Sequence, residues 1–443
     1  MKRMLIFSST VLAAVCPAMT SAQPPGGAFL RLTLDEAIRL GLSTSHRIGE
    51  ATARGEAAEA VANVRRAATL PQIAAQGGYT RTNHVDEFGV LLPTNQLRII
   101  YPDVPDNYRS RLDLQWPIYT GGRLEALERA ARIDATASGD EIAAARGDLT
   151  LDITRAYWTL VTAAESLRVV QEAVGRAGAH LTDVRNPLAA GLIPPNDVFT
   201  VEAQESRQRM LAVQAAAARD IAEAELGRLT GTAPDIPIEP AGAPSPEPAS
   251  TLPLQALIDA ARRQRPERAA LEKRVRAAAE RAQAAAAGTK PVVAVGGGVD
   301  YANPNPRIFP REAAWRTSWD AGVNVNWPLF DGGRARSEQA EASAQARALQ
   351  ARLADFDASL ATEVRQRVRE QQASRAAIDA AADAVRSAAE ARRVLGDRFA
   401  VGVATATDVL DAQVALLQAE LDRTQAMANA HLADARLART IGR

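Results

Sequence analysis

The sequence has 443 residues, and its 52 lysines and arginines are balanced by 52 aspartates and glutamates. It therefore lacks the basic excess that a nucleic-acid-binding protein normally carries. Aromatic residues make up only 4%, which argues against a wide globular core, and the abundance of alanine favours long, closely packed helices.

Residues 1–22 are expected to be an export signal. Lys2 and Arg3 give it a positive start, an apolar run follows, and three small residues precede the expected cleavage site. A buried N-terminal helix is the alternative interpretation. The only cysteine, Cys16, lies inside this segment, so cleavage after residue 22 would leave a chain without thiol chemistry. Lipidation of Cys16 fits poorly, because a valine rather than a small residue precedes it.

The rest of the sequence contains an internal duplication. The stretch LQWPIYTGG at 114–122 returns as VNWPLFDGG at 325–333, after an interval of 211 residues. Upstream the interval is 220 residues, so the first copy holds nine extra residues between Pro71 and Trp116, which are expected in a surface loop. We expect a first structural repeat over 23–230, a proline-rich linker over 231–252 and a second repeat over 253–443.

Each repeat is expected to contain a helix, two strands, a very long helix and a final helix, in that order. In the first repeat these elements are expected at 33–69, 71–82, 109–118, 123–185 and 196–229. In the second repeat they are expected at 253–287, 291–301, 315–329, 334–398 and 407–440.

The long helices set the height of the molecule. A helix of about 63 residues spans roughly 95 Å, and the two shorter helices of each repeat add up to a similar length. We therefore expect the two short helices to stack end to end beside the long one. An extended coiled coil without a pore is the alternative that the helices alone leave open.

The expected strands have one apolar and one polar face. Odd positions from Trp315 to Trp327 are mostly apolar, with tryptophans toward both ends, and the even positions are mostly polar. Aromatic residues at both ends of an apolar band are typical of membrane barrels, and strands of about 9–12 residues can cross a bilayer. A soluble sheet with one buried face is the alternative. Four strands cannot close a barrel, whereas three copies would supply twelve strands and two copies eight.

The repeated motif is expected to join each strand to a long helix. Proline would end strand pairing, and the two glycines would let the backbone turn. The residues of these joints are Trp116, Pro117, Gly121, Gly122, Trp327, Pro328, Gly332 and Gly333.

Two repeated motifs resemble those of the TolC-type outer membrane efflux family of Gram-negative bacteria. They are W-P-[IL]-[YF]-x-G-G-R at 116–123 and 327–334, and G-x(5)-D-V-[FL] at 191–199 and 402–410. The resemblance implies a mainly α fold with membrane β structure: long helical hairpins form a periplasmic tunnel, and four strands per chain contribute to a trimeric 12-stranded barrel.

The resemblance also implies a function and partners. The homotrimer would be a passive duct in the outer membrane that extends into the periplasm. It would export substrates delivered by an inner-membrane pump of the RND, ABC or MFS type through a periplasmic adaptor protein. The alternative is a periplasmic coiled-coil scaffold or adaptor without a pore, which leaves the tryptophan-bearing strands without a use.

The same resemblance places the turns between the long and final helices at the periplasmic tip, where the adaptor would make contact. The residues at these turns are Gly191, Asp197, Gly402 and Asp408. Asp408 and Asp411 match an acidic ring at the narrow entrance, where six carboxylates around one axis would attract cations and raise each other's pKa. Helix capping by Asp408 is the alternative, and both roles can hold together. Phe399 and Ala404 depart from the tyrosine and basic residue that some members carry there.

No catalytic pattern is found in the sequence. Its four histidines have no metal-ligand spacing, and neither G-x-S-x-G nor a P-loop occurs. The run Gly296–Gly298 lies inside an expected strand with no helix after it, which favours close strand packing or a bulge over phosphate binding. We therefore expect no enzyme activity, no cofactor and no metal site, and the exported cargo is not indicated.

Overall fold

The structure is a computed structural model that describes residues 29–189, 194–241 and 253–443. The expected export signal lies outside the described residues, as does the linker from residue 242 onward. The elements in chain order are β1 (Leu30–Leu32), α1 (Leu34–Thr44), α2 (His46–Ala67), β2 (Gln72–Arg81), β3 (Phe88–Leu91), β4 (Leu97–Tyr101), β5 (Asp106–Tyr119), α3 (Arg123–Ala189), α4 (Pro195–Thr230), β6 (Ile238–Pro240), α5 (Leu254–Gln264), α6 (Pro266–Ala286), the 3-10 turn η1 (Ala287–Thr289), β7 (Val292–Asn303), β8 (Arg316–Asn326), α7 (Arg334–Ala400) and α8 (Ala406–Thr440).

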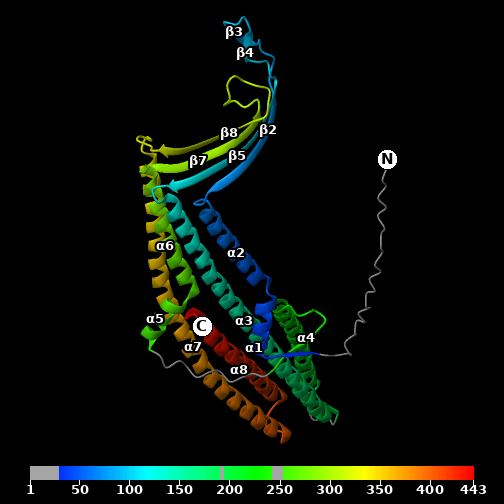
Figure 1. Cartoon of the computed structure of the whole chain (residues 1–443). Helices are drawn as coiled ribbons and strands as arrows, with labels where there is room; N and C mark the ends of the chain where they lie inside the picture. Colours follow the sequence, from blue (N-terminus) through cyan, green and yellow to red (C-terminus); the bar gives the residue numbers. More distant parts are fainter. Residues whose placement is uncertain (1–28, 190–193, 242–252) are drawn as a thin grey trace, which may run out of the picture.

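A curved sheet caps one end of a bundle of long helices (Figure 1). The helices α3 and α7 have 67 residues each, which corresponds to about 100 Å. Helix α2 packs on α3 near the sheet and α4 packs on α3 farther away, while α6, α5 and α8 pack on α7. In each repeat the shorter helices therefore lie one after another along the long helix, as expected from their lengths.

The two repeats share one antiparallel sheet with the strand order β2-β5-β7-β8. Its register aligns Leu112 of β5 with Val299 of β7 and Val299 with Trp319 of β8, so apolar side chains share one face. The neighbouring row aligns Arg111 with Asp300 and forms the polar face. The alternation expected from the sequence therefore persists across all four strands, and the expected combination of long helices with four strands per chain is confirmed.

Each expected first helix is in fact two helices. Ser45 separates α1 from α2 and Arg265 separates α5 from α6, both with extended backbone angles and 220 residues apart. Arg265 precedes a proline, which disfavours the helical conformation. At the first break the Thr44 hydroxyl donates to the Thr230 carbonyl oxygen at 2.9 Å, and at the second Arg265 donates to the Thr440 carbonyl oxygen at 3.3 Å. Each break therefore lies against the end of the last helix of its own repeat.

The extra residues of the first repeat form a β-hairpin rather than an irregular loop. Strands β3 and β4 pair antiparallel, and the turn between them contains Asn95 with a φ of 58°. The hairpin continues beyond the end of the sheet that is remote from the helices (Figure 1).

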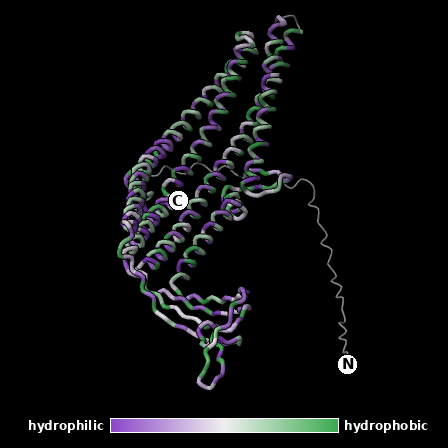
Figure 2. Tube along the Cα trace, turned by 90° about the horizontal axis from the view of Figure 1, so that it is seen from above, coloured by the Kyte–Doolittle hydropathy of each residue, from purple (hydrophilic) through white to green (hydrophobic). Residues whose placement is uncertain are grey.

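The largest apolar core lies at mid-height rather than at either end. Leu149, Tyr157 and Leu160 of α3 pack there with Leu226 of α4 and Ile238 of β6, which pairs with β1. Elsewhere hydrophobic and hydrophilic residues are interleaved along the helices (Figure 2). Among the residues that the structure describes, no helix combines the length and the apolar character needed to cross a membrane.

Candidate functional site

Two tryptophans tie the start of each strand–helix joint to the end of the preceding helical segment. The Nε1–H of Trp116 donates to the Thr69 carbonyl oxygen at 3.3 Å, and that of Trp327 donates to the Thr289 carbonyl oxygen at 3.2 Å. The two acceptors are 220 residues apart, which is the upstream repeat interval. The sequence pattern singled out the two tryptophans but not their hydrogen bonds to Thr69 and Thr289. The repetition of these two threonines was the signal in the sequence that could have indicated the contact.

The glycine pairs turn the chain from strand into long helix. Gly121 and Gly122 have φ angles of 66° and 88°, and Gly332 and Gly333 have φ angles of 67° and 86°. Only glycine adopts this left-handed region without strain. The same backbone turn is therefore used in both repeats.

The two prolines of the joints differ in their relation to the sheet. Pro328 follows the end of β8 at Asn326, so strand pairing stops before this proline, whereas the strand had been expected to extend to residue 329. Pro117, in contrast, lies inside β5 opposite Ala294, and pairing resumes at Tyr119 after a bulge. A bulge tolerates proline because its backbone nitrogen needs no partner there. The expectation that Pro117 stops strand pairing was wrong.

A first prediction compares the equivalent glycines of the two joints. Gly121→Ala is expected to destabilise the protein more than Gly332→Ala, although both substitutions carry about 1–2 kcal/mol of left-handed strain. A Cβ on Gly121 would lie 2.7 Å from Lys290 Cβ, whereas a Cβ on Gly332 would meet no described atom within 4 Å. Denaturant unfolding of the two variants measures the difference, and equal losses would contradict close packing at the first joint.

The turn between α7 and α8 is held by backbone and capping contacts. Gly402 has a φ of 75°, and its N–H donates to the Phe399 carbonyl oxygen at 2.9 Å. Thr405 caps α8: its hydroxyl accepts from the Asp408 N–H, and the Asp408 carboxylate accepts from the Thr405 N–H at 2.8 Å. This reciprocal arrangement is a capping box. The capping role proposed for Asp408 from the sequence is therefore present.

The two acidic residues of this turn are exposed on one face of α8. Asp408 and Asp411 are three residues apart, so their side chains are neighbours, while Val409 and Leu410 between them are buried. Hydrogen bonds from the Thr405 backbone and hydroxyl lower the pKa of Asp408 below its usual value. In the single chain this direction is opposite to the rise expected from a ring of carboxylates.

The turn between α3 and α4 is less fully described. Gly191 lies outside the described residues. Asp197 lies in the first turn of α4, where it accepts from the Asn196 side chain at 3.1 Å. Pro194 occupies the position equivalent to Thr405 and has no hydroxyl, so this helix has no side-chain capping bond.

An apolar cluster joins the two tip turns. Leu181, Val184, Val198 and Val201 of the first repeat pack with Ala406 and Leu410 of the second. Phe399 contacts the His180 ring edge-to-face at 5.3 Å, and burial lowers the pKa of His180. Phe399 therefore supplies packing where the family resemblance pointed to a polar latch in some members.

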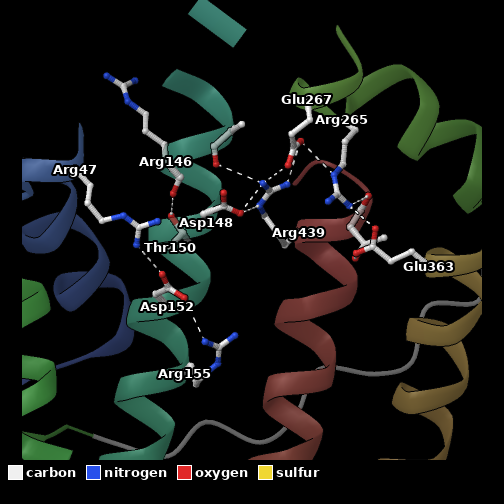
Figure 3. Close-up of polar contacts among 12 residues, drawn as sticks. Arg47, Arg146, Asp148, Thr150, Asp152, Arg155, Arg265, Glu267, Glu363 and Arg439 are labelled. Atoms are coloured by element: carbon white, nitrogen blue, oxygen red, sulfur yellow. Dashed lines mark hydrogen bonds and ion pairs between the residues drawn. The ribbon is translucent and has the colours of Figure 1, made fainter. Parts of the chain in front are cut away.

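A charged cluster links both repeats at mid-height (Figure 3). Arg439 of α8 donates to Asp148 of α3 at 2.7 Å and also pairs with Glu267 of α6. Beside it, Arg265 pairs with Glu363 of α7 at 3.2 Å. Sequence reasoning missed this cluster. In the part of the chain that the structure describes, no group of three or more histidine, cysteine or acidic side chains is placed to hold a metal ion.

Comparisons with known proteins agree with this architecture. A family model described as Outer membrane efflux protein matches residues 37–232 and 257–443. Protein CyaE of Bordetella pertussis is 27% identical over 313 residues, which cover 70% of this chain and 62% of that protein. The chain thus matches less than two thirds of that relative's length.

Solved outer membrane proteins share the fold. VceC of Vibrio cholerae superposes with a TM-score of 0.76 at 22% identity, covering 92% of this chain and 96% of that one. The CmeC outer membrane channel of Campylobacter jejuni gives a TM-score of 0.78 at 14% identity, covering 98% and 94%.

Proposed function

This chain belongs to the outer membrane efflux protein family, and from that premise we propose that it is the passive outer membrane channel of a tripartite efflux or type I secretion system. The observation that carries the proposal is the apolar face of the four-stranded sheet. Its large side chains are exposed, as in Ile73, Leu112, Trp319 and Val325. Exposed apolar surface of this extent marks a contact with lipid or with another protein.

Aromatic residues border this apolar face at both ends. Tyr79, Tyr108, Tyr301 and Trp315 form a chain of ring contacts at the end remote from the helices. Trp116 and Trp327 lie at the joints, and both are exposed. Aromatic girdles at two membrane interfaces have this arrangement. Eleven residues of β8 extend about 36 Å, enough to cross the hydrocarbon core when tilted.

The open edges of the sheet support a trimer. Strands β2 and β8 each have one neighbour within the chain. Unpaired backbone groups are not tolerated in lipid, so β8 of one chain would pair with β2 of the next until the sheet closes. Three chains give a barrel of 12 strands, continued by three pairs of long helices as a tunnel.

The tunnel would depend on partners at its far end to drive export, because the sequence contains no P-loop. We propose that a periplasmic adaptor contacts the tip turns, which include Asp197, Gly402 and Asp408. An inner-membrane pump of the RND, ABC or MFS type would supply the cargo. The pump and adaptor, rather than the duct, would choose between drugs, metals and proteins.

Conductance in planar bilayers tests the channel directly. The detergent-extracted protein should cross-link as a trimer and produce discrete ion currents. A soluble species that gives no current would contradict the proposal and favour the periplasmic scaffold.

A second prediction concerns the acidic tip. The double variant Asp408→Asn and Asp411→Asn is expected to lose preference for cations, because a ring of six carboxylates attracts them. Reversal potentials in asymmetric salt measure this preference. Thr405→Ala is the control for capping, since it breaks the capping box and keeps both charges. Asp197→Asn controls for charge loss at the other turn. If Thr405→Ala alone reproduces the change, or the double variant leaves selectivity unchanged, the acidic ring is contradicted.

A further inference from the structure

The loop between β7 and β8, residues 304–315, folds back across the polar face of the sheet. Asn305 is 2% exposed, and its side chain donates to the Ser318 hydroxyl at 3.0 Å and to the Arg316 carbonyl oxygen at 2.9 Å. Ser318 aligns with Asp300 across the strand pair and therefore belongs to the polar row. The loop is thus anchored on the polar side of the sheet by Asn305, whereas Trp315 at its end contacts Tyr301 on the apolar side.

Two arginines extend this anchorage over three strands. Arg307 pairs with Asp320 of β8 at 2.9 Å and donates to the Trp319 carbonyl oxygen at 2.9 Å, at the free edge of the sheet. Arg311 donates to the Asn107 side chain of β5 at 2.8 Å and to the Tyr101 hydroxyl of β4 at 2.9 Å. The loop therefore crosses β7 on the polar side and is tied down on both sides of it.

Where the loop crosses β7, it covers part of that strand. Ala302 is 1% exposed, although it lies on the polar face of the sheet. Asp300, on the same face, is 2% exposed and is also paired with Arg109 and Arg111 of β5. Without the loop, a water-filled pore would wet position 302. Beneath the loop remains a pocket of about 310 Å³, lined on the strand side by Gln76, Thr80 and Arg109 and on the loop side by Pro304 and Arg311.

We propose that this loop is a second constriction of the channel, at the barrel end remote from the helices. The proposal rests on the proposed function, because the polar face lines a lumen only if the sheet closes into a barrel. Three chains would then bring three inward-folded loops to the external mouth. Each loop carries Arg307, which is paired with Asp320, and Arg311, which donates to neutral groups. The tip at the other end carries exposed Asp408 and Asp411.

Cysteine labelling from outside the cell tests whether the loop covers Ala302. A membrane-impermeant maleimide should react with Ala302→Cys about tenfold more slowly than with Thr80→Cys, because only a local opening of the loop exposes position 302. Thr80 lies on the same face near the same end and is exposed. The unaltered protein, whose only cysteine is Cys16, gives the background.

A second experiment removes one of the side chains that anchor the loop. Arg311→Ala is expected to accelerate labelling of Ala302→Cys and, without any added cysteine, to raise the single-channel conductance. Arg98→Ala is the matched control, because Arg98 is an exposed arginine of the β3–β4 hairpin. Equal labelling of positions 302 and 80, or unchanged conductance in Arg311→Ala, would overturn the constriction. An unaltered protein without any conductance would instead contradict the proposed function.

Discussion

Replacing Arg439 with methionine is expected to lower the free energy of unfolding by about 2 kcal/mol, because it removes charged hydrogen bonds to the half-exposed Asp148 and to Glu267, which keeps only Arg265 as a partner. The Arg439 guanidinium donates to Asp148 through Nε at 3.0 Å and Nη2 at 2.7 Å, and it pairs with Glu267. Its side chain is only 9% exposed. Methionine keeps the apolar stem, so the loss reports on the charged contacts.

Arg439 stabilises the contact between the two repeats. Asp148 belongs to α3 of the first repeat, and Glu267 and Arg439 belong to α6 and α8 of the second (Figure 3). Gly147 makes room for the arginine, since a Cβ there would lie 2.9 Å from Arg439 Nε. Loss of the arginine would therefore leave the Glu267 carboxylate half-buried without its interhelical partner.

Arg228 provides the matched control, because it precedes Arg439 by the repeat interval of 211 residues. Its side chain is 65% exposed and pairs with Glu225 three residues earlier on the same helix. Arg228→Met should therefore change stability by about 0.5 kcal/mol or less. Denaturant midpoints of the detergent-solubilised proteins compare the two, and equal effects would contradict a special role for Arg439.

The pH dependence of stability tests the contact between Arg439 and Glu267 independently. Burial alone would raise the pKa of Glu267, but hydrogen bonding by Arg439 and the nearby Arg265 charge bring the pKa below its usual 4.5. A carboxyl group with a lowered folded-state pKa contributes stability above its unfolded pKa and loses it as the pH falls through the folded pKa. The stability difference between the unaltered protein and Arg439→Met should therefore shrink below about pH 4.5.

The sequence predicted those features that depend on local or repeated patterns. Period-two alternation placed the apolar face of the sheet, and the 211-residue interval aligned Gly121 with Gly332. For the run Gly296–Gly298 the sequence indicated close strand packing or a bulge, and the structure has close packing, since a Cβ on Gly298 would lie 2.8 Å from the Leu112 carbonyl oxygen. Each of these features can be recognised either from residues close together in the sequence or from comparison of the two repeats.

Other features depend on contacts that no local pattern encodes. Arg439 and Asp148 are 291 residues apart, and the equivalent arginine of the first repeat has no such partner. The break at Ser45 has no proline after it, and the adjacent Thr44 hydroxyl donates to the Thr230 carbonyl oxygen at the far end of the same repeat. The covering of Ala302 by its loop likewise depends on Asn305 reaching Ser318 after a tight reversal of the chain. Tertiary contacts decide all three.

Replacing Gly297 with valine is expected to abolish the folded assembly in the outer membrane. Gly297 lies in the middle of β7, opposite Ala321 of β8. A Cβ at this position would lie 2.6 Å from the Asp320 carbonyl oxygen and 3.2 Å from Ala321 Cα. Both are backbone atoms, so no side chain can rotate away to relieve the overlap.

The overlap would act on the whole sheet because β7 is a central strand. Moving β8 away from β7 would break the backbone hydrogen bonds between them and leave polar groups unpaired in lipid. In a closed barrel such a displacement would also shift β8 against β2 of the next chain. The substitution should therefore affect trimer formation as well as folding of the single chain.

Gly77→Val separates this steric effect from a general cost of replacing glycine in a strand. Gly77 lies on the same apolar face, on β2, and a Cβ there would meet no described atom within 4 Å. A lipid-facing valine at this position should be tolerated, because apolar side chains suit that surface. The amount of cross-linked trimer in outer membrane fractions measures both variants. Near-normal trimer for Gly77→Val and its loss for Gly297→Val are expected. Near-normal trimer in Gly297→Val would contradict the predicted overlap, and an equal loss in both variants would indicate a general cost of replacing a strand glycine.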